Sequence, residues 1–163
     1  MHPIFERFMN AATMIDAEQE LLCQGAGAVA SLAAFFNGDE KNEWDVPYRQ
    51  FGLPMRCALE VARRMGPAAK PLEAYLRAEL DDGRFIAAMA LGALGTLDEA
   101  SVVSLAGRLR DGSDMACECA LALIHCGMET HAAVTKVLAN SYQASRDFRR
   151  TQAFAQRSNG KQA

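Results

Sequence analysis

Residues 84–112, RFIAAMALGALGTLDEASVVSLAGRLRDG, decide how this chain is expected to fold. Apolar side chains recur in this stretch every three or four positions, which is the spacing of one helix face, and Gly95 separates two such runs. A glycine at that point is suited to the left-handed residue that ends a helix before a tight turn. The stretch therefore predicts two helices joined by a short turn.

The same arrangement returns elsewhere in the chain. Two further segments superpose on residues 84–112 without gaps when they are aligned on Gly66 and Gly127, and a weaker copy is anchored on Gly25. The aligned positions hold small or aliphatic residues each time: Ala58, Ala87 and Cys119; Ala62, Leu91 and Leu123; Leu76, Leu105 and Val137. The longer step from the first glycine to the second places an insertion within residues 37–52. The copies together predict an all-α fold of about four helix pairs.

The ends of the predicted helices carry their own signals. Asp16 and Asp98 are suited to cap the start of a helix, and Pro54 is suited to a first helical turn. We assign residues 1–145 to one repeat domain. Residues 146–163 form a basic C-terminal extension, expected to be helical to about Ala155 and partly disordered beyond it. Apolar residues at helical spacing ahead of the first copy predict an N-terminal capping helix: Ile4, Phe5, Phe8, Met9, Ala12 and Ile15.

Residues 84–112 resemble a short HEAT repeat of the type first described in phycobilisome lyases. The likeness lies in the pattern R-x-x-A-A-x-A-L-G-x-L-G of the first helix and in an aliphatic second helix that ends in Asp. It extends over roughly residues 54–142 and only loosely over residues 16–36. The resemblance implies a right-handed α-solenoid of about four HEAT-like helical hairpins. It also implies a scaffold or binding surface, because the motif is a packing pattern that carries no chemistry of its own.

Length and composition exclude several classes of protein. A chain of 163 residues suffices for one domain. Half of the residues are apolar but only 7% are aromatic, which favours close-packed helices over a β fold. The net charge of −3 argues against a dedicated nucleic-acid binder. Residues 21–38 are uncharged but too polar and glycine-rich to span a membrane, and we detect no signal peptide. Five cysteines without a CxxC pair favour the reducing cytoplasm over a secreted disulfide framework.

The residues that could carry chemistry are few. Histidine occurs only at His2, His125 and His131, and the last two lie near Cys126, Glu129 and a pair of cysteines. That pair, Cys117 and Cys119, would point about 200° apart on a helix, so both thiols cannot face one metal ion. No nucleophile elbow, P-loop or dinucleotide fingerprint is present. We therefore predict no catalytic residue, no metal and no cofactor.

Two regions are candidates for binding a partner. The insertion holds the only tryptophan, Trp44, with Tyr48, Phe51 and the acids Asp39, Glu40, Glu43 and Asp45. Aromatic residues are enriched at the energetic centres of interfaces, so the insertion is either a recognition loop or a filler whose aromatic side chains fold back between repeats. The second helices are expected to line a concave face with exposed Glu73, Arg77, Glu79, Ser104 and Arg108. The predicted partner-binding residues are Trp44, Asp45, Glu43, Tyr48, Glu73, Arg77 and Arg108.

The charge distribution of the chain indicates what kind of partner these candidate residues would bind. Residues 146–163 carry five basic residues and one acidic residue, which leaves 12 basic and 19 acidic residues in the body. An acidic body favours a basic partner. The leading hypothesis is a non-catalytic protein-binding module, and more narrowly a bacterial immunity-type inhibitor that neutralises a toxic effector enzyme. The alternatives are an adaptor or assembly factor for a larger complex and a lyase-like enzyme. The expected partner is another protein, with no nucleic acid and no membrane, and the oligomeric state stays open.

Overall fold

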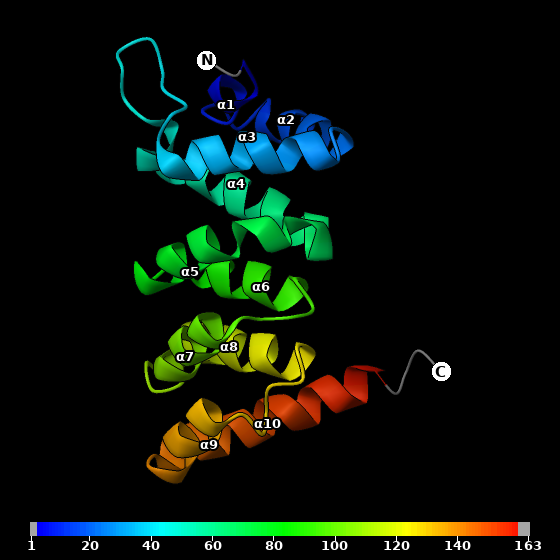
Figure 1. Cartoon of the computed structure of the whole chain (residues 1–163), viewed down its shortest axis with the longest axis vertical. Coiled ribbons are helices and arrows are strands. Elements are labelled where there is room, and N and C mark those ends of the chain that lie inside the picture. The colour runs from blue at the N-terminus through cyan, green and yellow to red at the C-terminus, as the bar shows by residue number, and fades with distance from the viewer. Residues whose placement is uncertain (1–2, 160–163) are drawn as a thin grey trace.

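The computed structural model describes residues 3–159. Within this range the chain is helical and has no β-strand, and the isolated bridge between Lys41 and Pro47 lies in a loop. Figure 1 shows the helices stacked along one long axis, with the N-terminal helices at one end and the C-terminal helix, α10 (Tyr142–Asn159), at the other. The prediction of an all-α fold is confirmed.

The first helix of each predicted pair belongs to one row, which we call the first-helix layer. In this row each helix packs against the next, and the strongest packing is at the centre of the stack. Small apolar side chains permit this close approach. The row consists of α2 (Met14–Cys23), α4 (Gly52–Met65), α6 (Phe85–Ala93), α8 (Ser113–His125) and α10 (Tyr142–Asn159).

The second helices form a parallel row on the other side of the stack. Here α3 contacts η2, α5 contacts α7, and α7 contacts α9, while α5 and α7 also pack against α6 and α8 of the first-helix layer. The molecule therefore has two layers that bury one shared core between them. The second row consists of α3 (Ala26–Asn37), the 3₁₀ helix η2 (Gly66–Leu72) with α5 (Glu73–Asp81), α7 (Glu99–Arg108) and α9 (Ala132–Ala139).

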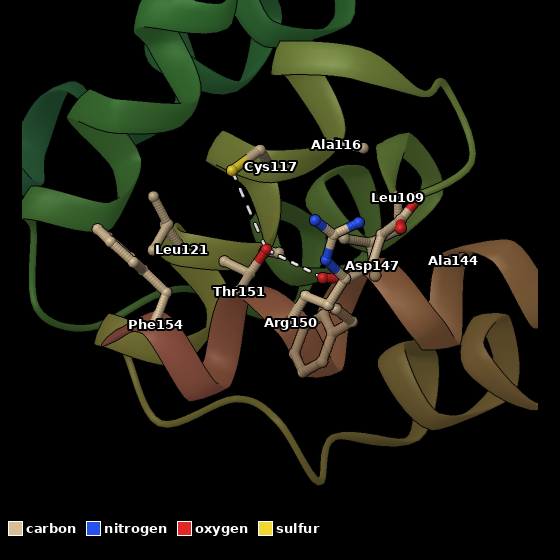
Figure 2. Close-up of a pocket in the computed structure, with 11 residues that line it drawn as sticks. Leu109, Ala116, Cys117, Leu121, Ala144, Asp147, Arg150, Thr151 and Phe154 are labelled. Carbon is tan, nitrogen blue, oxygen red and sulfur yellow. Dashed lines mark hydrogen bonds between the residues drawn. The ribbon is translucent and has the colours of Figure 1, made fainter. Parts of the chain in front are cut away.

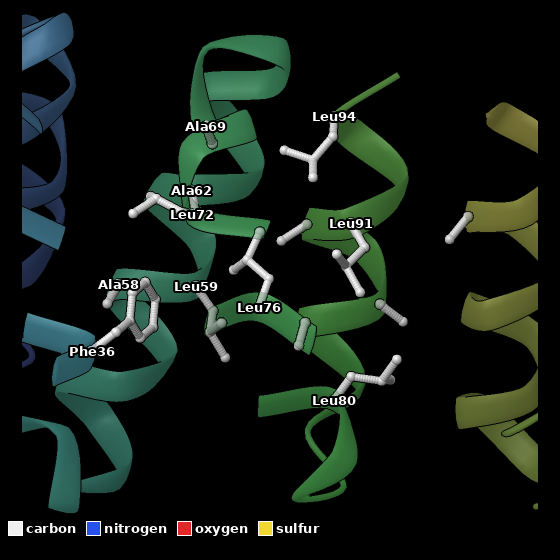
Figure 3. Close-up of a cluster of buried hydrophobic side chains, with 14 of the residues drawn as sticks. Phe36, Ala58, Leu59, Ala62, Ala69, Leu72, Leu76, Leu80, Leu91 and Leu94 are labelled. Carbon is white, nitrogen blue, oxygen red and sulfur yellow. The ribbon is translucent and has the colours of Figure 1, made fainter. Parts of the chain in front are cut away.

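The core contains most of the positions that align between the repeats. Leu91 of α6 is fully buried, and Figure 3 shows it beside Leu76 and Leu80 of α5. Small residues set the distance between first helices, because a Cβ at Gly92 would lie 2.8 Å from the Cα of Ala122. All members of the two aligned columns ahead of the glycines are buried: Ala58, Ala87, Cys119, Ala62, Leu91 and Leu123.

The turn chemistry expected from the sequence is present at most helix ends. The glycine anchors Gly25, Gly66, Gly95 and Gly127 all have positive φ, between 56° and 75°. These glycines are therefore used for a backbone conformation that other residues rarely adopt. The carboxylate of Asp98 accepts a hydrogen bond from the Ser101 amide at 2.6 Å and caps α7, as predicted.

Asp16 does not cap a helix. Thr13 holds the N-cap position of α2, and Asp16 lies inside the first turn, where its negative charge still complements the helix dipole.

The N-terminal capping helix is shorter than predicted. It comprises α1 (Pro3–Arg7) alone, so the expectation of one helix that includes Ile15 is wrong. Asn10 accepts a hydrogen bond from the Ala12 amide at 2.9 Å, and the Thr13 hydroxyl donates to the Arg7 carbonyl at 2.8 Å. Such local side-chain bonds compete with helix formation. The apolar set divides accordingly, since Ile4, Phe5 and Phe8 are buried whereas Met9, Ala12 and Ile15 are not.

The C-terminal segment is part of the packed stack up to Asn159. Helix α10 runs through residue 145, so the boundary predicted there falls inside a helix. Phe148 and Ala155 are buried, and α10 packs against α8 and α9. The helix continues past Ala155, where fraying was expected, to Asn159. The remainder of the predicted disordered segment, residues 160–163, lies outside the described residues.

Candidate functional site

The tip of the insertion is held by one asparagine. The side-chain oxygen of Asn42, a buried residue, accepts hydrogen bonds from the amides of Trp44 and Val46, both at 3.0 Å. The Asn42 amide in turn donates to the Val46 carbonyl at 3.0 Å. The loop is therefore a defined turn rather than a loose linker, and it presents Trp44 in a fixed position.

The base of the insertion is anchored in the core. Tyr48 is fully buried, its ring centroid lies 6.3 Å from that of Phe5, and its hydroxyl donates a hydrogen bond to Glu6. Burial first, and then this hydrogen bond, raises the pKa of Tyr48 far above its ordinary value. The next residue, Arg49, donates to the buried Glu79 at 3.0 Å. The insertion is thus tied to both α1 and α5.

The filler interpretation of the insertion is confirmed for one of its aromatic residues, and its use as a recognition loop stays a prediction. Tyr48 is a filler residue, whereas Trp44 points away from the core with 73% of its surface exposed. Glu43 and Asp45 beside it are also exposed, and Asp45 forms an ion pair with Lys41 at 2.9 Å. Of the four predicted partner-binding residues in the insertion, only Trp44, Glu43 and Asp45 are therefore available at the surface.

The second-helix layer uses its charged residues internally. Glu73 and Glu79 are buried, so the expectation that both are exposed is wrong. Glu73 pairs with Lys70 and accepts a hydrogen bond from the Asp98 amide at 2.8 Å. Glu79 accepts from Arg84 at 2.7 Å as well as from Arg49. Buried carboxylates need such partners, and these contacts join consecutive repeats.

The two predicted binding arginines are also engaged within the chain. Arg77 lies 3.0 Å from the Asp98 carboxylate and 3.3 Å from the Ser101 hydroxyl. Burial alone would raise the pKa of Asp98, but the hydrogen bonds from Ser101 and Arg77 lower it below its ordinary value. Arg108 donates to the carbonyl of Asp81 and pairs with Asp111 at 3.1 Å. These side chains hold α5 against α7, which leaves few free charges on this face.

Three hollows lie on the first-helix layer. A cavity of about 610 Å³ opens between α2, α4 and α6, a second of about 330 Å³ between α4, α6 and α8, and a third of about 530 Å³ between α8 and α10. Met89 lines the first and second, and Leu121 lines the second and third. The three hollows are therefore neighbours along the first-helix layer, and together we call them the first-helix groove.

The walls of the first-helix groove are apolar and partly exposed. Ile15 is 59% exposed and Phe85 is 47% exposed, and both line the first hollow, so that hollow presents large apolar side chains to solvent. Figure 2 shows the far end of the groove, where Leu121 of α8 and Phe154 of α10 face each other and the Thr151 hydroxyl lies 4.0 Å from the Cys117 thiol. The sequence analysis missed this groove.

Charged side chains rim the groove. Glu60 holds Arg63 in a two-point ion pair that includes a 2.9 Å hydrogen bond, and the Arg63 guanidinium lowers the pKa of Glu60. Partial burial, and then the charge of Asp114, raises the pKa of Glu118. Arg56 forms no ion pair with any residue in the described part of the chain. The groove thus combines an apolar floor with an unpaired cation.

A cysteine on the groove floor is a poor nucleophile. Cys57 is buried, and burial first, followed by the neighbouring Glu18 carboxylate, raises the pKa of its thiol to about 12. Such a thiol stays protonated near neutral pH, and the thiolate is the reactive species. Cys57 therefore contributes to the groove as a small apolar residue.

The histidines are separated in the structure. His131 caps α9, since its Nδ1 accepts from the Ala133 amide at 3.2 Å, and its Nε2 lies 2.8 Å from Glu99. Because Nδ1 is an acceptor, the proton is on Nε2, which donates to Glu99. His125 is exposed at the rim of the first-helix groove, and the predicted candidate His2 lies outside the described residues.

Three further findings bear on the class of the protein. Among residues 3–159, no group of three or more His, Cys, Asp or Glu side chains is placed to hold a metal ion. No helix in the same range combines the length and apolar character needed to cross a membrane. A comparison with protein families, curated proteins and solved structures finds no match to this chain.

Proposed function

We propose that this chain is a non-catalytic protein-binding module, a right-handed solenoid of HEAT-like repeats that holds a partner in the first-helix groove. The observation that carries the proposal is the row of three neighbouring hollows on the first-helix layer, which share Met89 and Leu121 as lining residues. The exposed side chains of Ile15, Phe85 and Phe154 along the groove gain from being covered, because removing apolar surface from water is favourable by roughly 25 cal/mol per Å².

The spacing of the hollows favours a helical partner. Neighbouring packed helices lie about 8–10 Å apart, so the hollows between successive first helices recur at about that interval. On a helix that crosses the layer, side chains seven residues apart recur every 10.5 Å or so. An amphipathic helix with an apolar residue at every seventh position therefore matches the groove. The unpaired Arg56 favours an acidic side chain on that helix near its first anchor.

The narrower form of the proposal is an immunity-type inhibitor of a toxic enzyme. Its support is the acidic balance of residues 1–145 and the exposed Trp44 between Glu43 and Asp45, which suit a basic enzyme surface. An adaptor for a larger complex is the competing form. A toxin-like reading frame next to the gene, with growth rescued by co-expression, is expected only for the inhibitor. Turnover by the purified chain alone would favour a lyase-like enzyme instead.

The groove is tested with a matched pair of substitutions. Phe85→Asp places a charge in the first-helix groove, whereas Val103→Asp places one on α7, where Val103 is 50% exposed. Partners recovered from the native host with the unchanged chain are titrated against both variants. We expect Phe85→Asp to weaken binding by about tenfold or more, as loss of an apolar anchor does, and Val103→Asp to leave it unchanged. Equal affinities for both variants would exclude the groove as the binding site.

A further inference from the structure

The outer face of α10 is strongly basic. Arg146, Arg149, Arg150 and Arg157 fall within about 100° of one another on the helix, opposite the buried residues of α10. All four are exposed. In the described chain, Arg149, Arg150 and Arg157 form no ion pair, and Arg146 only approaches its neighbour Asp147 at 3.5 Å. We call these four arginines the basic face. No ion pair in the described structure joins the basic face to residues ahead of α10.

The opposite end of the molecule carries the matching charge. Residues 38–47 of the insertion contain four acidic residues and one lysine, while α10 contains four arginines and one aspartate. Within this loop Asp39 and Glu43 are exposed and free of ion pairs in the described structure. Trp44, exposed between the acids, offers the ring face that an arginine guanidinium prefers for cation–π contact.

The two surfaces cannot meet within one molecule. Figure 1 shows the loop at the N-terminal end of the stack and α10 at the other end. The loop is held by Asn42 and by buried Tyr48, and α10 is held by Phe148, which is buried where α10 packs against α8 and α9. Attraction between the surfaces is therefore satisfied only between molecules.

We propose that the basic face of α10 binds residues 38–47 of a second copy of this chain, head to tail. A contact between two different surfaces of one chain is heterologous, so it extends into a ring or an open row of molecules rather than closing as a dimer. This interface goes beyond the proposed function, and of the four arginines only Arg150 also lines the far hollow of the first-helix groove. Because both surfaces are exposed and charged, the association is weak and strongly dependent on salt.

The first test is sedimentation equilibrium of the full chain at two salt concentrations. Raising the salt from about 0.03 M to about 0.5 M shortens the Debye length from roughly 18 Å to roughly 4 Å. We expect a mass that rises with protein concentration in low salt and an association constant at least about tenfold lower in high salt. A wild-type chain that stays monomeric in low salt at about 0.1 mM overturns the proposal, whether or not it binds other acidic proteins.

Charge reversal identifies the surfaces. The variant Arg149→Glu/Arg157→Glu has two acidic ends, and Asp39→Lys/Glu43→Lys has two basic ends, so each alone should be monomeric in low salt. An equimolar mixture of the two should associate again, because each α10 then meets a loop of opposite charge. The control Arg56→Glu/Arg110→Glu changes net charge as much as the first variant at exposed positions outside the basic face and outside residues 38–47, and it should associate like the wild type.

The mixture decides the outcome. Restored association in the mixture, with unchanged circular dichroism melting of each variant, supports the head-to-tail contact. Association that survives in either variant alone, or a mixture that stays monomeric although both variants are folded, overturns it.

Discussion

Asp98 connects three parts of the chain through one residue. Its carboxylate caps α7 at the Ser101 amide and receives Arg77 from α5, while its own amide donates to buried Glu73. Because the same carboxylate caps α7 and pairs with a side chain of α5, it fixes the start of α7 relative to the preceding helix pair. The second-helix layer is thereby held together by polar contacts at its helix ends in addition to its apolar core.

Replacing Asp98 with alanine should lower the free energy of unfolding by about 1–2 kcal/mol, the usual loss for an N-cap, as measured by urea denaturation near neutral pH. The folded state lowers the pKa of Asp98, so its stabilisation is complete above the unfolded pKa and is lost as pH falls through the folded value. The gap between wild type and variant should therefore narrow below about pH 4. Asp82→Ala at the end of α5 is the control. A gap that is the same at every pH would contradict this role.

The cysteines should divide into two groups by reactivity. Burial raises the pKa of the Cys57 and Cys119 thiols to about 12 and also raises that of Cys126, whereas Cys23 and Cys117 are exposed. At pH 8 we expect two thiols to react rapidly with a disulfide reagent in the native chain and all five after denaturation. Mass mapping should place the rapid labels on Cys23 and Cys117. Rapid labelling of Cys57 would show that the groove floor opens in solution.

Helices α6 and α8 pack closely because α6 has a glycine, Gly92, at the point of contact. Gly92 has no side chain at the point where a Cβ would lie 2.8 Å from the Cα and 3.0 Å from the Cβ of Ala122. The obstacle is backbone, which can move only with its helix. The same close approach forms the floor of the middle hollow of the first-helix groove, since both residues line it.

Gly92→Ala should lower the free energy of unfolding by about 1–3 kcal/mol, because the added methyl group forces α6 and α8 apart. Gly107→Ala in α7 is the matched control, since a Cβ there meets nothing within 4 Å. That change should raise stability by about 0.5–1 kcal/mol by removing a flexible residue from a helix. Thermal and urea unfolding measure both. If the two substitutions shift stability in the same direction, the close contact between α6 and α8 is wrong.

At the scale of the whole molecule, the insertion works in two directions. Inward, Tyr48 packs beside Phe5 and bonds to Glu6, and Arg49 bonds to Glu79, so the segment joins α1 to α5. Outward, it presents Trp44 and its acidic neighbours at the N-terminal end of the stack. Substitutions at the two aromatic residues should therefore have opposite profiles for stability and binding.

Tyr48→Ala should lower the free energy of unfolding by about 3–5 kcal/mol, through a large cavity and a lost hydrogen bond. Trp44→Ala should change it by less than about 0.5 kcal/mol, because its side chain is mostly exposed. Circular dichroism melting compares both with the wild type, and Tyr48→Phe separates the hydrogen bond from the cavity. A large loss of stability in Trp44→Ala would mean that the tryptophan folds back as a filler after all.

The local features of this protein can be derived from its amino-acid sequence. The helical spacing of apolar residues, the glycines that end the first helices, the Asp98 cap and the buried position of Leu91 all follow from residues near one another in the chain. Such features depend on 3.6-residue periodicity and on the conformational freedom of single residues. The all-α class follows from them directly.

Packing between distant segments sets which polar residues are buried and where the groove lies. Glu73, predicted to be exposed, is buried because its partners Lys70 and Asp98 come from the preceding turn and the next helix pair. Tyr48 is buried and Trp44 is exposed, although both belong to one segment. The reason is that Phe5 and Glu6, more than forty positions before Tyr48 in the sequence, contact Tyr48 and not Trp44. The first-helix groove depends on side chains from five helices at once. Contacts between residues so far apart do not appear as a periodic pattern in the sequence, because they depend on how the helices pack against one another.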